Sequence, residues 1–189
     1  MHACGITTDK RQQGATALEF GLVFPVFFAV FYGGLMYGFI FLAQMGLQHA
    51  AADGARAALR FQDNVTYPTP AEDDTPQEIA LQRRLALLQA RVDAAKTVAN
   101  TRAGWMNGWA QPIVEAAICP AGIECDPTTA PATPDCSALT PTCQIVVTVT
   151  YPYGDSPIIP TLPGFNLLAP TQLQSSAQTL FNGKTLSTL

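Results

Sequence analysis

The side chains that most often carry acid–base chemistry or bind metals are scarce in this sequence. The chain has two histidines, His2 and His49, and it lacks a phosphate-binding loop, a serine nucleophile elbow and a paired zinc-binding histidine motif. The carboxylates of its C-terminal half are scattered without recognisable pairing: Glu115, Glu124, Asp126, Asp135 and Asp155. This inventory predicts a protein that is not an enzyme and that needs no metal or cofactor.

The composition points away from an ordinary soluble domain. Of the 189 residues, 48% are hydrophobic and 13% are charged, against about 25% charged residues in typical soluble domains. The formal net charge of -4 leaves no excess of positive charge for phosphate contacts, so nucleic acid is excluded as a partner. The balance favours a membrane-associated or exported protein.

The apolar residues are concentrated near the N-terminus. The 24 residues of the range 20–43 contain no Asp, Glu, Lys or Arg, and as a helix they would extend about 36 Å, more than the ~30 Å hydrocarbon core of a bilayer. A cleavable secretory signal has an apolar region of only about 7 to 15 residues. Lys10 and Arg11 precede the run, which predicts one spanning helix with a cytoplasmic N-terminus.

Glu19 stands at the front edge of this apolar run. A carboxylate in an uncharged membrane helix costs about 2 kcal/mol or more at depth and usually has a partner. If the chain were cut after Gly14, Ala15 would carry a new N-terminal amine, whose pKa is near ~8. Glu19 would then be the fifth residue of the mature chain, and a cation would exist to pair with it.

Three segments resemble a known family. The stretch Gly14–Phe20 is similar to the type IV prepilin processing signature: a Gly, four further residues, then Glu and an aromatic residue. Leu47–Arg56 resembles the segment that follows the membrane helix in TadE-like proteins, minor pseudopilins of tight-adherence (Tad/Flp) pili. Gln144–Tyr153 is similar to the Val-rich strand of that family, which ends in Tyr-Pro-Tyr. The resemblance covers residues 10–60 and, less strongly, 143–181.

The resemblance implies a processing step and an assembly contact. A prepilin peptidase on the cytoplasmic side would cut between Gly14 and Ala15. Glu19, followed by Phe20, would then pair with the N-terminal amine of a neighbouring subunit as the helix enters a filament. In the alternative interpretation, Gly14 is part of a linker and Glu19 extends to the lipid headgroups without any cleavage.

The same resemblance predicts the organisation and the role of the chain. Residues 1–14 would be a prepilin leader, 15–43 the transmembrane helix and 44–189 an exported head. The protein would be a minor pilin or pseudopilin that takes part in assembly or priming of a Tad/Flp-type pilus for surface adhesion. It would sit in the bacterial inner membrane with a periplasmic head, or outside the cell once in a pilus. Its partners would be the prepilin peptidase, other pilins, Tad inner-membrane components and lipid. The alternative function is a single-pass envelope binding module that never enters a filament.

The cysteines are consistent with export. Five is an odd number for an oxidising compartment, but a cut after Gly14 removes Cys4 and leaves four. Two disulfides would tie down the Pro- and Thr-rich region that contains them, and three connectivities are open, the two short loops being geometrically plausible. Their spacing does not fit the pattern of a zinc site. The predicted disulfide residues are Cys119, Cys125, Cys136 and Cys143.

Small residues recur every four positions along the N-terminal helix. In a membrane such a series allows another helix to approach closely, although the residues beyond the span could equally pack on the protein's own head. Either way the series predicts a contact face. Its members are Gly34, Gly38, Gly46, Ala50, Gly54 and Ala58.

The rest of the chain predicts a small head of mixed structure. Thr75 through Glu78 has the pattern of a helix N-cap with a capping box, followed by an amphipathic helix that ends near Gly104. β-branched residues predict strands at 113–118 and 144–151, and a third strand at 173–181. We therefore predict an α+β fold of the type IV pilin kind: a long N-terminal transmembrane helix, a second helix and a small antiparallel sheet.

Overall fold

The computed structural model describes residues 12–60, 62–63, 65–129, 136, 142–160 and 169–182, with residues 12–15 described as helix backbone. The predicted leader, apart from its last three residues, lies outside this part of the chain. The chain divides into two compact units, Met1–Ile40 and Phe41–Leu189.

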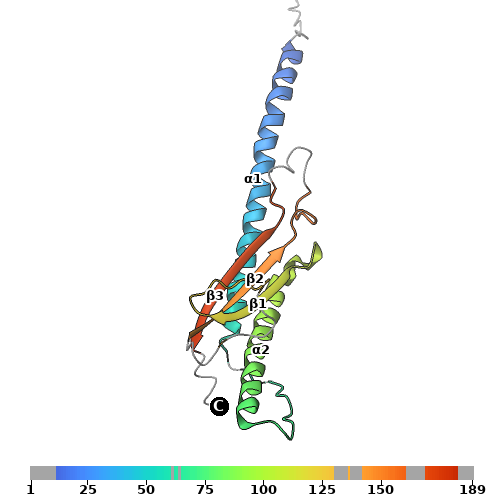
Figure 1. Cartoon of the computed structure of the whole chain (residues 1–189). Helices are drawn as coiled ribbons and strands as arrows, with labels where there is room; N and C mark the ends of the chain where they lie inside the picture. Colours follow the sequence, from blue (N-terminus) through green and yellow to red (C-terminus); the bar gives the residue numbers. More distant parts are fainter. Residues whose placement is uncertain are drawn as a thin grey trace, which may run out of the picture. The chain divides into compact units, whose positions relative to one another are not determined.

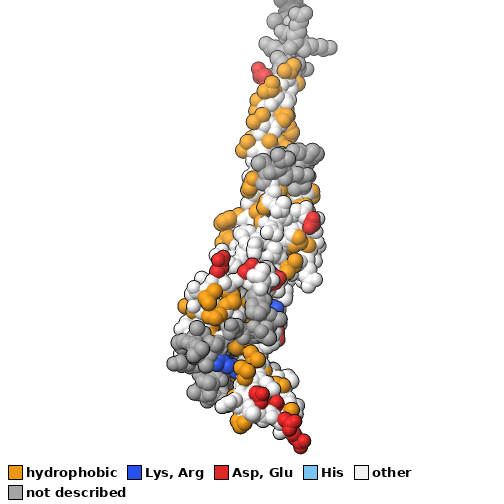
Figure 2. Space-filling view, viewed as in Figure 1, with side chains coloured by type: hydrophobic (Ala, Val, Ile, Leu, Met, Phe, Trp, Pro, Cys, Tyr) orange, Lys and Arg blue, Asp and Glu red, His pale blue; other side chains and the backbone are white. Residues whose placement is uncertain are grey.

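The first unit contributes the N-terminal part of one long helix, α1 (Gln12–Ala57). Here large apolar side chains face outward: Leu18 is 72%, Phe27 65% and Val30 73% exposed. Figure 2 shows hydrophobic side chains along this stretch. By length and composition the helix can cross a membrane, with a mean hydropathy of 2.0, and only 11% of its apolar window is buried. A helix from the core of a soluble protein would hide these side chains, so their exposure suggests a membrane anchor.

In the second unit, the last turns of α1 pack against α2 (Pro76–Ala103). Both helices bury mainly alanine at this contact, and small side chains let the two backbones come close. On α1 the buried residues include Leu47, Ala50, Ala51, Ala55 and Ala58, and on α2 they are Leu88, Val92, Ala95, Ala99 and Ala103.

The start of α2 has the predicted capping box. The Thr75 hydroxyl accepts a hydrogen bond from the Glu78 backbone N–H, and the Glu78 carboxylate accepts one from the Thr75 backbone N–H at 2.8 Å. Pro76 occupies the first helical position, where no backbone donor is needed. The bond from the Thr75 backbone N–H, and next that from its hydroxyl, lower the pKa of Glu78 below its usual value.

We expect Thr75→Ala to destabilise the head by about 1 kcal/mol, the usual cost of losing a threonine N-cap. The pKa of Glu78 should rise only part of the way to its usual value, because the backbone hydrogen bond remains. Since the folded pKa is depressed, the stabilisation by ionised Glu78 is present above the unfolded pKa and is lost as the pH falls through the folded one. Urea unfolding at several pH values measures this loss of stability. Thr97→Ala, at an exposed position inside α2, is the control. An unchanged midpoint for Thr75→Ala would contradict it.

A three-stranded antiparallel sheet completes the head (Figure 1). The strands are β1 (Ile113–Pro120), β2 (Thr142–Tyr151) and β3 (Leu173–Asn182), with β2 in the centre. Ala116 lies opposite Val147 in the first pairing, and Ala177 lies opposite Val147 in the second. The α+β fold predicted from the sequence is thus confirmed.

The central strand is buried on both faces. Ile145, Val147 and Val149 lie on the face that meets the helices, and each is fully buried. On the opposite face Val146 is 8% exposed and Thr148 3%. The strand is therefore covered on both faces, although Val and Thr alternate over residues 147–150.

Candidate functional site

The residues predicted to be processed lie at the beginning of α1. Gly14 and Ala15 are part of its helical backbone, which begins at Gln12. Glu19 follows Ala15 by four residues, so the two positions lie on the same face of the helix, one turn apart. The predicted assembly residue Phe20 is 65% exposed.

Glu19 is the only charged residue between Arg11 and Asp53. Its side chain is exposed among apolar neighbours, with Leu22 at 69% and Val23 at 61% exposure. Neither of the ion pairs in the described part of the chain involves it, because both are made by Asp53. In a bilayer this carboxylate would be an isolated charge at the edge of the apolar helix, where a cation from another molecule could reach it.

An aromatic ladder runs along the same helix. Phe20, Phe24, Phe28 and Tyr32 are four residues apart, and their rings stack in turn with centroid distances of 5.4, 6.0 and 6.0 Å. The sequence prediction missed this ladder, although the four-residue spacing that produces it is visible in the sequence. These side chains are partly or largely exposed, so the ladder forms an outer face of α1.

The series of small residues has two parts in the structure. Apart from the helix's own nearby backbone, no described atom lies within 4 Å of a Cβ built on Gly34 or Gly38. A Cβ on Gly46 would lie 2.8 Å from Cζ2 of Trp105, and Ala50 and Ala58 are buried. The second part of the series therefore packs on the protein's own head.

At Gly54 the close neighbours are a backbone atom and the side chains of two other elements. A Cβ added there would lie 2.9 Å from the Ala95 carbonyl oxygen and 2.9 Å from the Cβ of Ala99, with the Cγ1 of Val147 at 3.4 Å. Only glycine allows α1, α2 and the sheet to meet at this distance.

Arginines of α2 reach neighbouring elements, and two of them donate hydrogen bonds to backbone carbonyl oxygens. The Arg91 guanidinium donates a hydrogen bond of 2.9 Å to the Ala58 carbonyl oxygen at the C-terminal end of α1, and it lies over the Phe181 ring at 5.4 Å. Burial lowers the pKa of this guanidinium. A cation at a helix C-terminus also interacts favourably with the helix dipole. Arg84 donates to the Cys136 carbonyl oxygen, which holds that residue near α2.

The four cysteines form two disulfides, Cys119–Cys125 and Cys136–Cys143, which close loops with sequence separations of 6 and 7. Of the three connectivities open at the sequence level, the structure contains the one made of two short loops.

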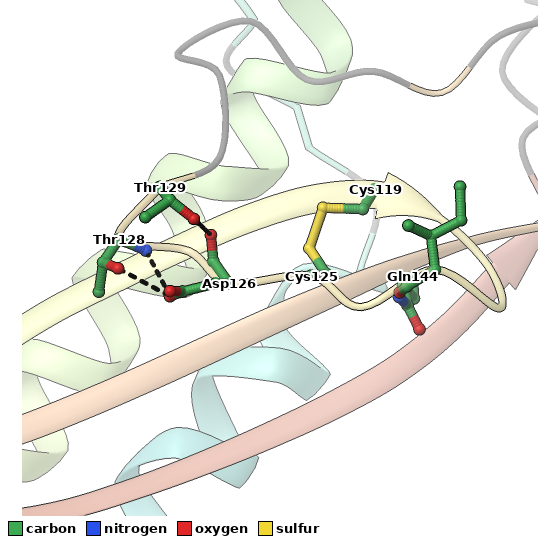
Figure 3. The surroundings of a disulfide bond; sticks show 7 residues. Cys119, Cys125, Asp126, Thr128, Thr129 and Gln144 are labelled. Carbon is green, nitrogen blue, oxygen red and sulfur yellow. Dashed lines mark hydrogen bonds between the residues drawn. A yellow bond between two sulfur atoms is a disulfide. The ribbon is translucent and has the colours of Figure 1, made fainter.

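The loop closed by the first disulfide is also held by hydrogen bonds (Figure 3). Gln144 of β2 donates to the Ile123 carbonyl oxygen at 2.6 Å. Asp126 accepts from the Thr128 backbone N–H at 3.0 Å and from the Thr128 hydroxyl at 2.8 Å, and these bonds lower the pKa of the Asp126 carboxyl. Within the described residues no group of three or more His, Cys, Asp or Glu side chains could hold a metal ion.

The Tyr-Pro-Tyr sequence closes the central strand. Tyr151 and Tyr153 are both buried, and their rings pack edge to face with centroids 6.5 Å apart. The Tyr151 hydroxyl donates to the Ser156 carbonyl oxygen at 2.7 Å. Burial, and next the nearby Tyr153, raise the pKa of Tyr151. The motif acts here as part of the core.

The described residues thus include an exposed apolar helix with one carboxylate near its start. Residues 14–56 match the family model described as TadE-like protein. This confirms the family resemblance for that segment, and the match begins at Gly14 itself. Residues 143–181 lie outside the matched range, so their resemblance stays a prediction. Neither a curated protein nor a solved structure matches the chain.

Proposed function

We propose that this protein is a minor pilin or pseudopilin of a Tad/Flp-type pilus and that it acts in pilus assembly or priming. The observation that carries the proposal is the TadE-like match over residues 14–56, which starts at the residue where a prepilin peptidase would cut. A Tad-associated membrane protein is the broader function that this match suggests. The exposed apolar helix supports an anchor in the bacterial inner membrane, with the head on the periplasmic side.

In this proposal the peptidase hydrolyses the peptide bond between Gly14 and Ala15. Water supplies the hydroxyl of the new Gly14 carboxyl group and a proton for the new amine. With a pKa near ~8, the Ala15 amine is mostly protonated at neutral pH. The leader would then be residues 1–14, the membrane helix 15–43 and the head 44–189.

The freed amine gives Glu19 a partner. A carboxylate in an apolar helix is costly when it is alone, and a nearby cation offsets much of that cost. The pairing would be strongest between adjacent subunits in lipid or in a filament core, where water screens little. The protein would then act by packing its helix against other subunits, and not by catalysis. Prepilin peptidase, other pilins and the Tad inner-membrane components would be its partners.

Coexpression with a prepilin peptidase tests the processing step. We expect the unchanged chain to lose residues 1–14 and Gly14→Leu to keep them, because a peptidase that requires glycine before the cut cannot accept leucine. Gly21→Leu is the matched control, since no described atom beyond the nearby helix backbone lies within 4 Å of a Cβ at that helical glycine. Intact-mass spectrometry reads each product. Cleavage of Gly14→Leu at the same bond, or no cleavage of the unchanged chain, would contradict the proposal.

A further inference from the structure

The turn after α2 contains both tryptophans of the chain. Trp105 and Trp109 lie on and beside the short 3-10 helix η1 (Gly104–Gly108), and their rings meet edge to face at 6.5 Å. Each is 49% exposed, whereas Met106 between them is fully buried. Ile113, at the start of β1, is 55% exposed. We call these three exposed side chains, Trp105, Trp109 and Ile113, the tryptophan patch.

The tryptophan patch lies beside the first turns of α1 that belong to the second unit. α2 runs antiparallel to the end of α1: Arg91 contacts Ala58, and Arg102 pairs with Asp53 at 3.1 Å. Trp105 continues this sequence of contacts and lies against Gly46. Gly46 is three residues beyond Ala43, the end of the apolar run, or about 4.5 Å along the helix.

The sheet places Ile113 at the same end by a separate set of contacts. The Gln44 side chain donates to the Gln174 carbonyl oxygen at 2.7 Å, which fixes the start of β3 beside the end of the apolar run. Leu173 pairs with Tyr151 across the sheet. The neighbouring residue Thr150 pairs with Ile113. The contact of Trp105 with Gly46 and the hydrogen bond from Gln44 to the start of β3 are independent of each other. Both place the patch beside residues 44–46 of α1.

The chemistry of this segment fits a lipid headgroup layer. Residues 103–114 contain no Asp, Glu, Lys or Arg. Tryptophan has a large apolar ring and one polar N–H, and it is enriched where hydrocarbon meets water. A turn exposed only to water would place half of each ring in contact with solvent without any compensating interaction.

We propose that the tryptophan patch rests in the headgroup layer of the bilayer that α1 crosses, so that the head is seated on the membrane before assembly. This inference depends on the membrane anchor of the proposed function, but not on cleavage or on pilus formation. The partner is a phospholipid surface. The contact would fix the orientation of the head and would be released when the subunit leaves the membrane.

Fluorescence of the full-length protein tests the proposal directly, because all tryptophan emission comes from this patch. The protein is reconstituted into phosphatidylcholine vesicles whose acyl chains carry bromine near the headgroup or near the chain end. We expect emission to be quenched in both, and more strongly by the shallow bromine. Emission should also shift to shorter wavelength relative to the urea-unfolded protein.

A relocated tryptophan supplies the control. Leu81, near the start of α2, is 56% exposed, similar to the two tryptophans, and it lies about 33 Å from the C-terminal end of that helix. Leu81→Trp in a Trp105→Phe, Trp109→Phe background should show no quenching. Vesicle flotation after carbonate washing measures anchoring separately. Unquenched native emission from protein that floats would overturn the lipid contact and leave the patch to a protein partner, without affecting the proposed function. Loss of flotation would contradict the anchor and this inference together.

Discussion

Replacing Glu19 with leucine is expected to block pilus assembly while leaving membrane insertion intact. The substitution makes the apolar helix more hydrophobic, so insertion should not suffer. It removes the only anionic side chain between Arg11 and Asp53, and with it the partner proposed for the Ala15 amine of a neighbouring subunit. The protein in sheared pilus fractions should fall to background, while carbonate-resistant protein in membranes stays at the level of the unchanged chain.

Glu72→Leu is the matched control for this experiment. It removes the same charge from an exposed loop residue of the head and should leave the pilus fraction unchanged. The N-terminus of the Glu19→Leu protein is measured in parallel, because failure of processing would also prevent assembly. Normal pili that contain cleaved Glu19→Leu protein would contradict the pairing and would favour the alternative of an anchored binding module.

The second large effect is expected at Gly54. Gly54→Leu should destabilise the head by about 3 kcal/mol or more, the upper range for overpacking a closely packed interior. The first added carbon alone would lie 2.9 Å from the Ala95 carbonyl oxygen and from the Cβ of Ala99. A backbone oxygen cannot move aside as the end of a flexible side chain can, so α1 and α2 would have to separate.

Urea unfolding in detergent, followed by tryptophan fluorescence, measures this loss. Gly34→Leu provides the control, because it makes the same change in the same helix at a position where the new Cβ has no described atom within 4 Å beyond the nearby helix backbone. Its unfolding midpoint should stay within experimental error of the unchanged protein. Equal midpoints for Gly54→Leu and the unchanged chain would contradict the packing described for α1 and α2.

Elements with strong local signals could be predicted from the sequence. The capping box at Thr75 and Glu78 marks the start of α2 because both hydrogen bonds are local. The third predicted strand agrees with β3 to within one residue, and the central strand was predicted two residues short. An apolar side chain such as Val146 on its second face indicates that this face is covered, but not which element covers it.

Contacts between distant segments could not be predicted in the same way. The spacing of Gly46 and Gly54 indicated a contact face, but a helix in a membrane and a helix in a packed head select small residues for the same reason. Gly46 contacts Trp105 and Gly54 contacts α2, and both contacts depend on tertiary structure. The disulfide connectivity could not be predicted either, because four cysteines permit three pairings and the sequence does not choose between them.

The candidate site is local, and for that reason it was visible in the sequence. Glu19 stands out because no other charge occurs along that part of α1, and Gly14 because of its distance from Glu19. Their roles depend on other molecules, a peptidase and a neighbouring subunit, and a single chain carries no geometry for such partners. The roles of these two residues therefore stay proposals that biochemistry must test.

The most direct test is the intact mass, with N-terminal sequencing, of the protein extracted from the membranes and pili of its native cells. Our account predicts a mature chain that begins with Ala15, and with it the free amine that Glu19 needs. A chain that still begins with Met1 in cells whose pili assemble normally would contradict it.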